Sequence, residues 1–163
     1  MTTLQHALKR GIEAVYQLEE SELVGEPLPN KDNRQSILFF EAAEGGAGVL
    51  TRLATEPHAL AAVAAEALEI MHFKPPAEGQ AWEHGNLVEE KDEHGEPICE
   101  AGCYRCLLSY YNQPDHPLID RKDAEAKGLV LQVLCRLTAS KLALGTQGRA
   151  PPVSYTHLTL PTN

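Results

Sequence analysis

The sequence lacks any apolar run of the length that spans a bilayer, and its first residues lack the basic and then apolar pattern of a secretory signal. From these two absences we expect a cytoplasmic protein without a membrane partner. In that compartment, neighbouring thiols hold metal more often than they form stable disulfides.

Motifs for nucleotide hydrolysis are missing as well. The chain contains neither a G-x-x-x-x-G-K-[ST] loop nor an Asp-Glu-x-His box. It therefore cannot hydrolyse ATP by the mechanism that these motifs serve, and we do not expect it to be an enzyme.

An excess of positive charge is also absent. The sequence has 14 Lys and Arg residues and 23 Asp and Glu residues, which give a formal net charge of −9. This balance argues against a domain that coats nucleic acid by charge alone. The most basic stretch carries Arg121, Lys122 and Lys127, but acidic residues alternate with them. We therefore interpret residues 120–127 as a solvated helix face.

The length of 163 residues suffices for one domain with a core of its own. We expect residues 1–150 to form this domain, as a fragment of a longer protein. Residues 153–163 resemble translated sequencing adapter, and we expect residues 151–163 to be an artefact rather than part of the fold.

Hydrophobic periodicity predicts an α+β fold in which helices pack on a small sheet. The apolar residues of the second expected strand are consecutive, which indicates burial on both of its faces. The expected strands lie near residues 22–28 and 36–42, and the expected helices cover residues 3–18, begin near residue 49, run from about 55 to 71, and cover 123–142 with Asp120 or Asp123 as cap.

Two segments between these elements are distinctive. Gly45, Gly46 and Gly48 form a turn between a strand and a helix; such a turn can bind phosphate, but a tight turn for close packing is the favoured interpretation. Residues 74–98 are rich in proline, glycine and charge and predict a long loop. Loops of this length are unusual unless they are functional or tied down.

A cysteine cluster follows directly after that loop. Cys103 and Cys106 form a C-x-x-C turn that can supply two corners of a tetrahedral zinc site, and Cys99 can reach a third. Zinc would also relieve the repulsion among three neighbouring thiolates. The spacing therefore favours structural zinc over a redox pair at Cys103 and Cys106, and over a buried cluster without metal.

The fourth ligand is open at this point. His116, ten residues after the last clustered cysteine, is the first choice, and His72, at the end of the alanine-rich helix, is the alternative. Cys135 falls in an apolar helical pattern and is interpreted as a buried small hydrophobe. Tyr110 and Tyr111 could stack on bases, but packing is the favoured interpretation.

Four segments in order, "TLQHALKRGIEAV", "ILFFEAAEGGAGVL", "CEAGCYRCLLSYYNQPDH" and "LIDR", resemble the MrfA-like zinc-binding domain found towards the C-terminus of DEAD/DEAH-box superfamily-2 helicases of DNA repair and phage defence. The resemblance covers about residues 3 to 140. It implies zinc as cofactor, with Cys99, Cys103 and Cys106 as ligands. It also implies that many relatives have a further cysteine near the end of the alanine-rich helix, where this sequence has Met71 and His72.

The same resemblance implies an accessory domain whose partners are the helicase motor domains of the same polypeptide and, through them, DNA. A free-standing thiol redox protein and a zinc-dependent protein-docking module remain the alternatives.

Overall fold

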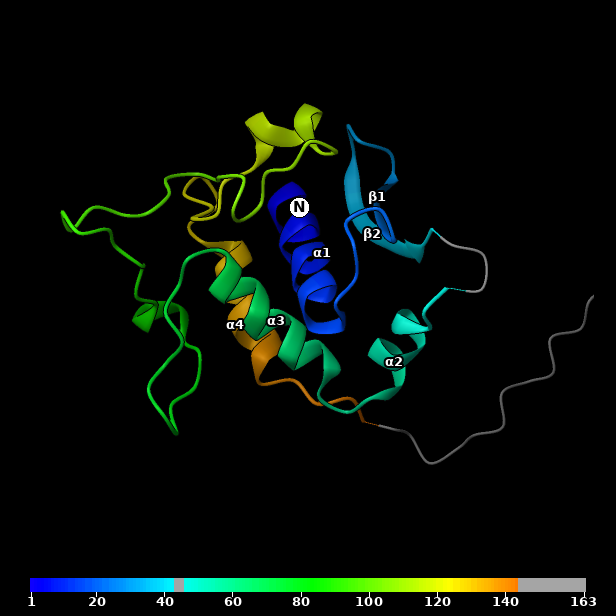
Figure 1. The fold of residues 1–163 in the computed structure, drawn as a ribbon, viewed down its shortest axis with the longest axis horizontal. Helices are drawn as coiled ribbons and strands as arrows, with labels where there is room; N and C mark the ends of the chain where they lie inside the picture. The colour runs from blue at the N-terminus through cyan, green and yellow to red at the C-terminus, as the bar shows by residue number, and fades with distance from the viewer. Residues whose placement is uncertain (43–45, 144–163) are drawn as a thin grey trace, which may run out of the picture.

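The computed structural model of the protein describes residues 1–42 and 46–143. These residues form an α+β fold, as the hydrophobic pattern predicts. Figure 1 shows α1 between a two-stranded sheet on one side and the helices α3 and α4 on the other. In chain order the elements are α1 (Thr2–Tyr16), β1 (Leu23–Pro29), β2 (Arg34–Glu41), α2 (Val49–Thr55), α3 (Ala59–Ile70), the 3₁₀ helices η1 (His84–Asn86) and η2 (Gln113–Leu118), and α4 (Leu129–Thr138).

Small residues let α1 and α3 approach closely. Gly11 of α1 lies so near α3 that an added Cβ would come within 2.4 Å of the carbonyl oxygen of Val63. Ala64 and Ala67 of α3 are completely buried. Helix α3 also packs against α4, so α3 is held in place from two sides.

The strands β1 and β2 pair antiparallel, with Val24 opposite Phe40 and Glu26 opposite Leu38. Within the described ranges the sheet has these two strands alone. Phe39 packs towards the core, whereas Leu38 is 44% exposed and Phe40 38% exposed. The expectation that this strand is buried on both faces is therefore wrong, because the body of the protein covers one face of the hairpin only.

The glycine-rich turn after β2 is held by an acidic side chain. The Glu41 carboxylate accepts hydrogen bonds from the backbone N–H groups of Gly48 and Leu50, each at 2.9 Å. These bonds, led by the one from Leu50, lower the pKa of Glu41. The turn amides thus bind the protein's own carboxylate, which agrees with a packing turn. Gly46 and Gly48 have positive φ angles, which glycine tolerates, and Gly45 lies outside the described residues.

Helix boundaries differ from the expected ones where the backbone turns. Pro57 separates α2 from α3, which begins at Ala59. Helix α4 is shorter than the expected 123–142, because the chain turns at Lys127 and Gly128, both with positive φ. Neither Asp120 nor Asp123 is the N-cap residue, which is Gly128, but the Asp123 carboxylate accepts a 2.9 Å hydrogen bond from the Val130 N–H in the first turn of α4. No helix in the described part of the chain is long and apolar enough to cross a membrane.

Residues 74–98, called the excursion below, contain little regular structure, as expected (Figure 1). The segment begins with a short ladder beside the end of α3. There, the Lys74 N–H donates to the Val88 carbonyl and the Glu90 N–H donates to the His72 carbonyl, each at 2.8 Å. The excursion therefore leaves the body beside His72 and returns to it just before Cys99.

Candidate metal centre

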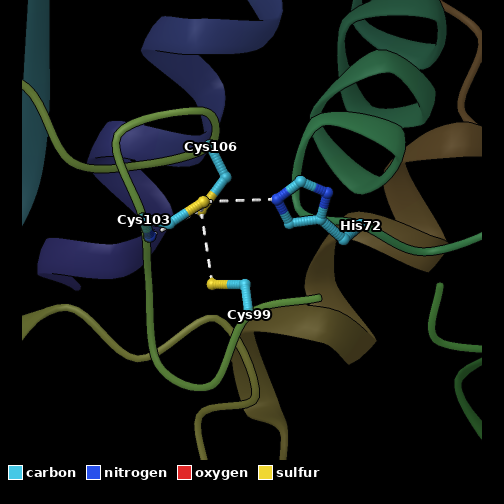
Figure 2. A group of neighbouring side chains, drawn as sticks. All are labelled: His72, Cys99, Cys103 and Cys106. Atoms are coloured by element: carbon cyan, nitrogen blue, oxygen red, sulfur yellow. Dashed lines mark hydrogen bonds between the residues drawn. The ribbon is translucent and has the colours of Figure 1, made fainter. Parts of the chain in front are cut away.

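The turn from Cys103 to Cys106 points both of its sulfurs to one side (Figure 2). The Cys106 N–H donates to the Cys103 carbonyl at 3.0 Å, which closes the turn. The Cys103 N–H donates in turn to the Sγ of Cys106 at 3.0 Å. Backbone donors of this kind stabilise a sulfur that carries negative charge. Cys99 reaches the same point from the end of the excursion.

The fourth member of the group is His72, which follows the C-terminal end of α3 (Figure 2). Its φ angle is 65°, a left-handed conformation that at helix ends is usually occupied by glycine. A histidine in this conformation carries a local backbone cost. Position 72 is therefore a histidine although the backbone conformation favours glycine, which indicates that the imidazole has a function there.

The four donor atoms have the spacing of a tetrahedral zinc site. One donor atom from each of the four residues lies within 4.8 Å of the others. The Sγ atom of Cys106 lies 3.8 Å from that of Cys99 and 3.5 Å from that of Cys103, and the His72 Nε2 lies 3.4 Å from the Cys103 Sγ. With ordinary zinc bond lengths, tetrahedral geometry places sulfurs about 3.8 Å apart and nitrogen about 3.6 Å from sulfur. The four residues therefore fit zinc.

The same distances exclude a disulfide in this arrangement, because an S–S bond measures about 2.05 Å. All four cysteines are free. A redox dithiol needs two sulfurs, whereas here a third sulfur and an imidazole converge on the same point.

Two of the three thiols do not ionise readily without a cation. Burial, followed by the charges of the neighbouring thiols, raises the pKa of Cys99 to about 12. Burial also raises the pKa of Cys106. For Cys103, burial again acts to raise the pKa, but hydrogen bonds from His72 and the Arg105 N–H outweigh it and lower the pKa to about 7. A divalent cation supplies the charge that lets all three ionise together.

The carboxylate of Glu90 orients the imidazole of His72. It accepts from the His72 Nδ1 at 3.4 Å, so Nδ1 keeps a proton. On zinc binding, Nε2, which faces the sulfurs, would lose the proton that it donates to Cys103 and offer its lone pair to the metal. Carboxylate partners of this kind fix the tautomer of metal-binding histidines.

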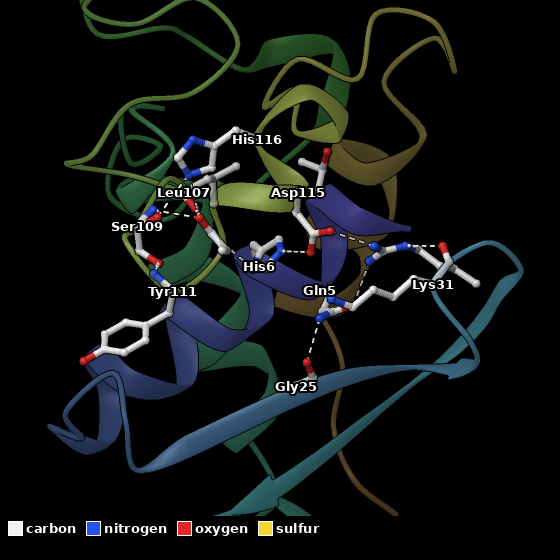
Figure 3. Close-up of polar contacts among 12 residues, drawn as sticks. Gln5, His6, Gly25, Lys31, Leu107, Ser109, Tyr111, Asp115 and His116 are labelled. Atoms are coloured by element: carbon white, nitrogen blue, oxygen red, sulfur yellow. Dashed lines mark hydrogen bonds and ion pairs between the residues drawn. The ribbon is translucent and has the colours of Figure 1, made fainter.

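His116, the first choice for the fourth ligand in the sequence, lies outside this group. Its Nε2 donates to the carbonyl oxygen of Ser109 at 3.0 Å and to the Oδ1 of Asn112 at 2.9 Å (Figure 3). With its proton on Nε2, this nitrogen has no lone pair to offer. The turn into η2 carries His116 away from the cysteines, and α3 brings His72 to them instead.

Two further predictions concern Cys135 and the adjacent tyrosines. Cys135 is buried in the apolar core and is not part of the metal-binding group, as predicted. The interpretation that Tyr110 and Tyr111 pack inside is wrong, because 77% and 71% of these residues are exposed. Their rings contact each other edge to face.

Sequence reasoning missed Arg121, which the charge pattern places on a solvated face. That interpretation is wrong, because the side chain is completely buried. Its guanidinium donates to the carbonyl oxygen of Cys99 at 2.8 Å, directly beside the metal-binding group. The alternating charges around it gave no signal of burial.

These features define a helical metal-binding domain with a β-hairpin and a donor set of three cysteines and one histidine. The sequence profile of the MrfA Zn-binding domain matches residues 4–107, which include all four donors and more than half of the chain. The chain belongs to the MrfA Zn-binding domain family, and its cofactor is zinc. Neither a curated protein nor a solved structure matches the sequence.

Proposed function

We propose that His72, Cys99, Cys103 and Cys106 hold one structural zinc ion and that the domain is an accessory domain without catalysis of its own. The observation that carries this proposal is the convergence of three sulfurs and one imidazole within 4.8 Å. A site with four protein ligands has no open position for water or substrate, which is typical of structural zinc.

The zinc ion would act as a clamp on the excursion. His72 precedes this segment and Cys99 follows it, so one ion joins both of its ends. The other two ligands, Cys103 and Cys106, then attach this junction to the turn that leads into η2. Zinc binding would therefore fix the excursion on the body of the domain rather than perform a reaction.

We propose further that the domain serves an ATP-dependent DEAD/DEAH-box helicase in the cytoplasm, in DNA repair or phage defence. Family membership supports this context, and the acidic net charge agrees with contact to DNA through the motor domains rather than through this domain. The test is the gene itself: helicase motifs in frame upstream of Met1 support the proposal, and a start site with its own ribosome-binding site contradicts it.

The ligand set is tested by counting zinc in purified protein. We expect one zinc per chain in the wild type and in His116→Ala, and a loss of zinc in His72→Ala during dialysis against a moderate chelator. Cys135→Ser is the control for the cysteines, because it removes a buried sulfur away from the site. Zinc retained in His72→Ala but lost in His116→Ala would refute the assignment.

A thiol redox function is the second candidate, because the pKa of Cys103 is about 7 and its Sγ lies 3.5 Å from that of Cys106. A thiol with this pKa reacts readily at neutral pH. Reversible oxidation of this pair in the zinc-loaded, folded protein would favour the redox function. Oxidation that requires release of the metal favours the structural site.

A further inference from the structure

Arg121 is the largest side chain that the described structure buries completely. A buried charge is costly unless all of its donors find partners. The guanidinium must therefore be held by a specific set of acceptors, and these acceptors show what the residue does.

Every acceptor lies at one end of the excursion or on its base. The Nε and Nη2 groups donate to the carbonyl oxygen of Cys99, and Nη1 donates to the carbonyl oxygen of Met71 at 3.1 Å. Nη2 also pairs with the carboxylate of Glu89. The guanidinium carbon lies 5.2 Å from the centre of the Phe73 ring.

Two of these partners belong to the proposed zinc site or lie next to it in the chain. Met71 is bonded to His72, and Cys99 is itself a donor of the metal-binding group. One side chain thus bridges the last residue before His72 and the residue that returns from the excursion. The backbone N–H of Arg121 adds a 2.7 Å bond to the carbonyl of Ala101, two residues beyond Cys99.

We propose that Arg121 is a positioning residue that holds His72 and Cys99 together before zinc binds. This inference rests on the proposed ligand set. A planar guanidinium can donate in several directions at once, whereas a lysine ammonium on a flexible stem does not span three fixed acceptors in the same way. Ligands that are held in advance lose less conformational freedom when the metal binds, so the affinity for zinc rises.

The first experiment measures zinc affinity on the full chain by competition with a chromophoric chelator. We expect Arg121→Lys and Arg121→Met to weaken zinc binding about 10- to 100-fold, the range seen for residues that orient metal ligands. Lysine keeps the positive charge. If Arg121→Lys also binds zinc weakly, the effect comes from the several hydrogen-bond donors of the guanidinium and not from its charge.

Arg34→Met is the matched control. Arg34 is also nearly buried and ion-paired, at 2.8 Å with Asp115, but it contacts no member of the metal-binding group. We expect this variant to be less stable and to bind zinc within about twofold of the wild type, because the two sites share no partner.

The second experiment measures hydrogen exchange in the metal-free protein. We expect the amides of Lys74 and Glu90, at the base of the excursion, to stay protected in the wild type and in Arg34→Met and to exchange quickly in Arg121→Lys. If Arg121→Met does not fold, the lysine variant decides both experiments.

Unchanged zinc affinity in the Arg121 variants, or an equal loss in Arg34→Met, overturns the inference. The ligand assignment fails in a different way: a wild type that takes up no zinc, or a His72→Ala variant that binds as tightly as the wild type, refutes the proposed site itself.

Discussion

The Nε2 atom of His72 lies 3.4 Å from the Sγ atom of Cys103, although 31 positions separate the two residues in the chain. The histidine follows the C-terminal end of α3, and the sulfur belongs to the C-x-x-C turn. Because the excursion lies between them, this contact makes the metal-binding group a property of the folded domain. A short peptide around the cysteines would lack its fourth donor.

The backbone at His72 predicts a difference between two variants that both lose the imidazole. In the metal-free protein, we expect His72→Gly to be more stable than His72→Ala by about 1 kcal/mol, because only glycine adopts a φ of 65° without cost. Denaturant unfolding in the presence of a chelator measures the difference. Equal stability would mean that the left-handed conformation imposes no strain at this position.

Zinc concentration should set the stability of the domain. Once free zinc exceeds its dissociation constant, each tenfold increase should raise the free energy of unfolding by about 1.4 kcal/mol if one ion binds the folded state only. Unfolding curves at several buffered zinc concentrations measure this slope. His116→Ala should keep the slope, whereas His72→Ala should show it only at much higher zinc. A slope that corresponds to two ions would contradict a single site.

Several parts of this structure could be predicted from sequence because they depend on local signals. Apolar residues at helical spacing predict α1, short apolar segments predict the two strands, and the spacing of Cys99, Cys103 and Cys106 predicts three of the four converging donors. Each of these features rests on residues that are near one another in the chain.

The remaining features depend on packing between distant segments. Closeness in sequence favoured His116 as the fourth donor, but α3 brings His72 to the sulfurs because α1 and α4 hold that helix in place. The burial of Arg121 depends in the same way on carbonyl groups from two other segments. The exposure of Phe40 depends on how many strands the sheet has, which the pattern of one strand does not encode.

The contact between α1 and α3 leads to a prediction at Gly11. Alanine favours helix over glycine by about 1 kcal/mol, yet we expect Gly11→Ala to destabilise the protein by about 1 to 3 kcal/mol, because the new Cβ would meet the Val63 carbonyl oxygen at 2.4 Å. Thermal or denaturant unfolding of zinc-loaded protein measures the change. Gly85→Ala is the control, because no atom lies within 4 Å of the added Cβ, and it should be nearly neutral. A more stable Gly11→Ala would show that the helices can separate without loss.

A second buried polar network predicts how stability depends on pH. The His6 Nε2 lies 2.9 Å from the Asp115 carboxylate, which also accepts from Arg34 at 2.8 Å (Figure 3). Burial lowers the pKa of His6; Asp115 opposes this effect, and the positive charges of Arg34 and Lys9 add to it. Burial acts to raise the pKa of Asp115, but hydrogen bonds from His6 and Arg34 outweigh it and lower that pKa.

Both groups therefore bind protons more weakly in the folded state than in the unfolded state. The stability that they contribute is present above the unfolded pKa values and is lost as the pH falls, first for His6 below about pH 6.5 and then for Asp115 below about pH 4. We expect the free energy of unfolding to fall from pH 7 to pH 5 in the wild type and to fall less steeply in His6→Gln.

Comparing the two proteins at the same zinc concentration removes the contribution of the metal site, which both share. His94→Gln is the control, because this side chain is 77% exposed and should leave the pH profile unchanged. Equal slopes for the wild type and His6→Gln between pH 7 and pH 5 would show that His6 does not resist protonation in the folded protein. The acid sensitivity would then have to come from groups that both proteins share, such as the zinc ligands.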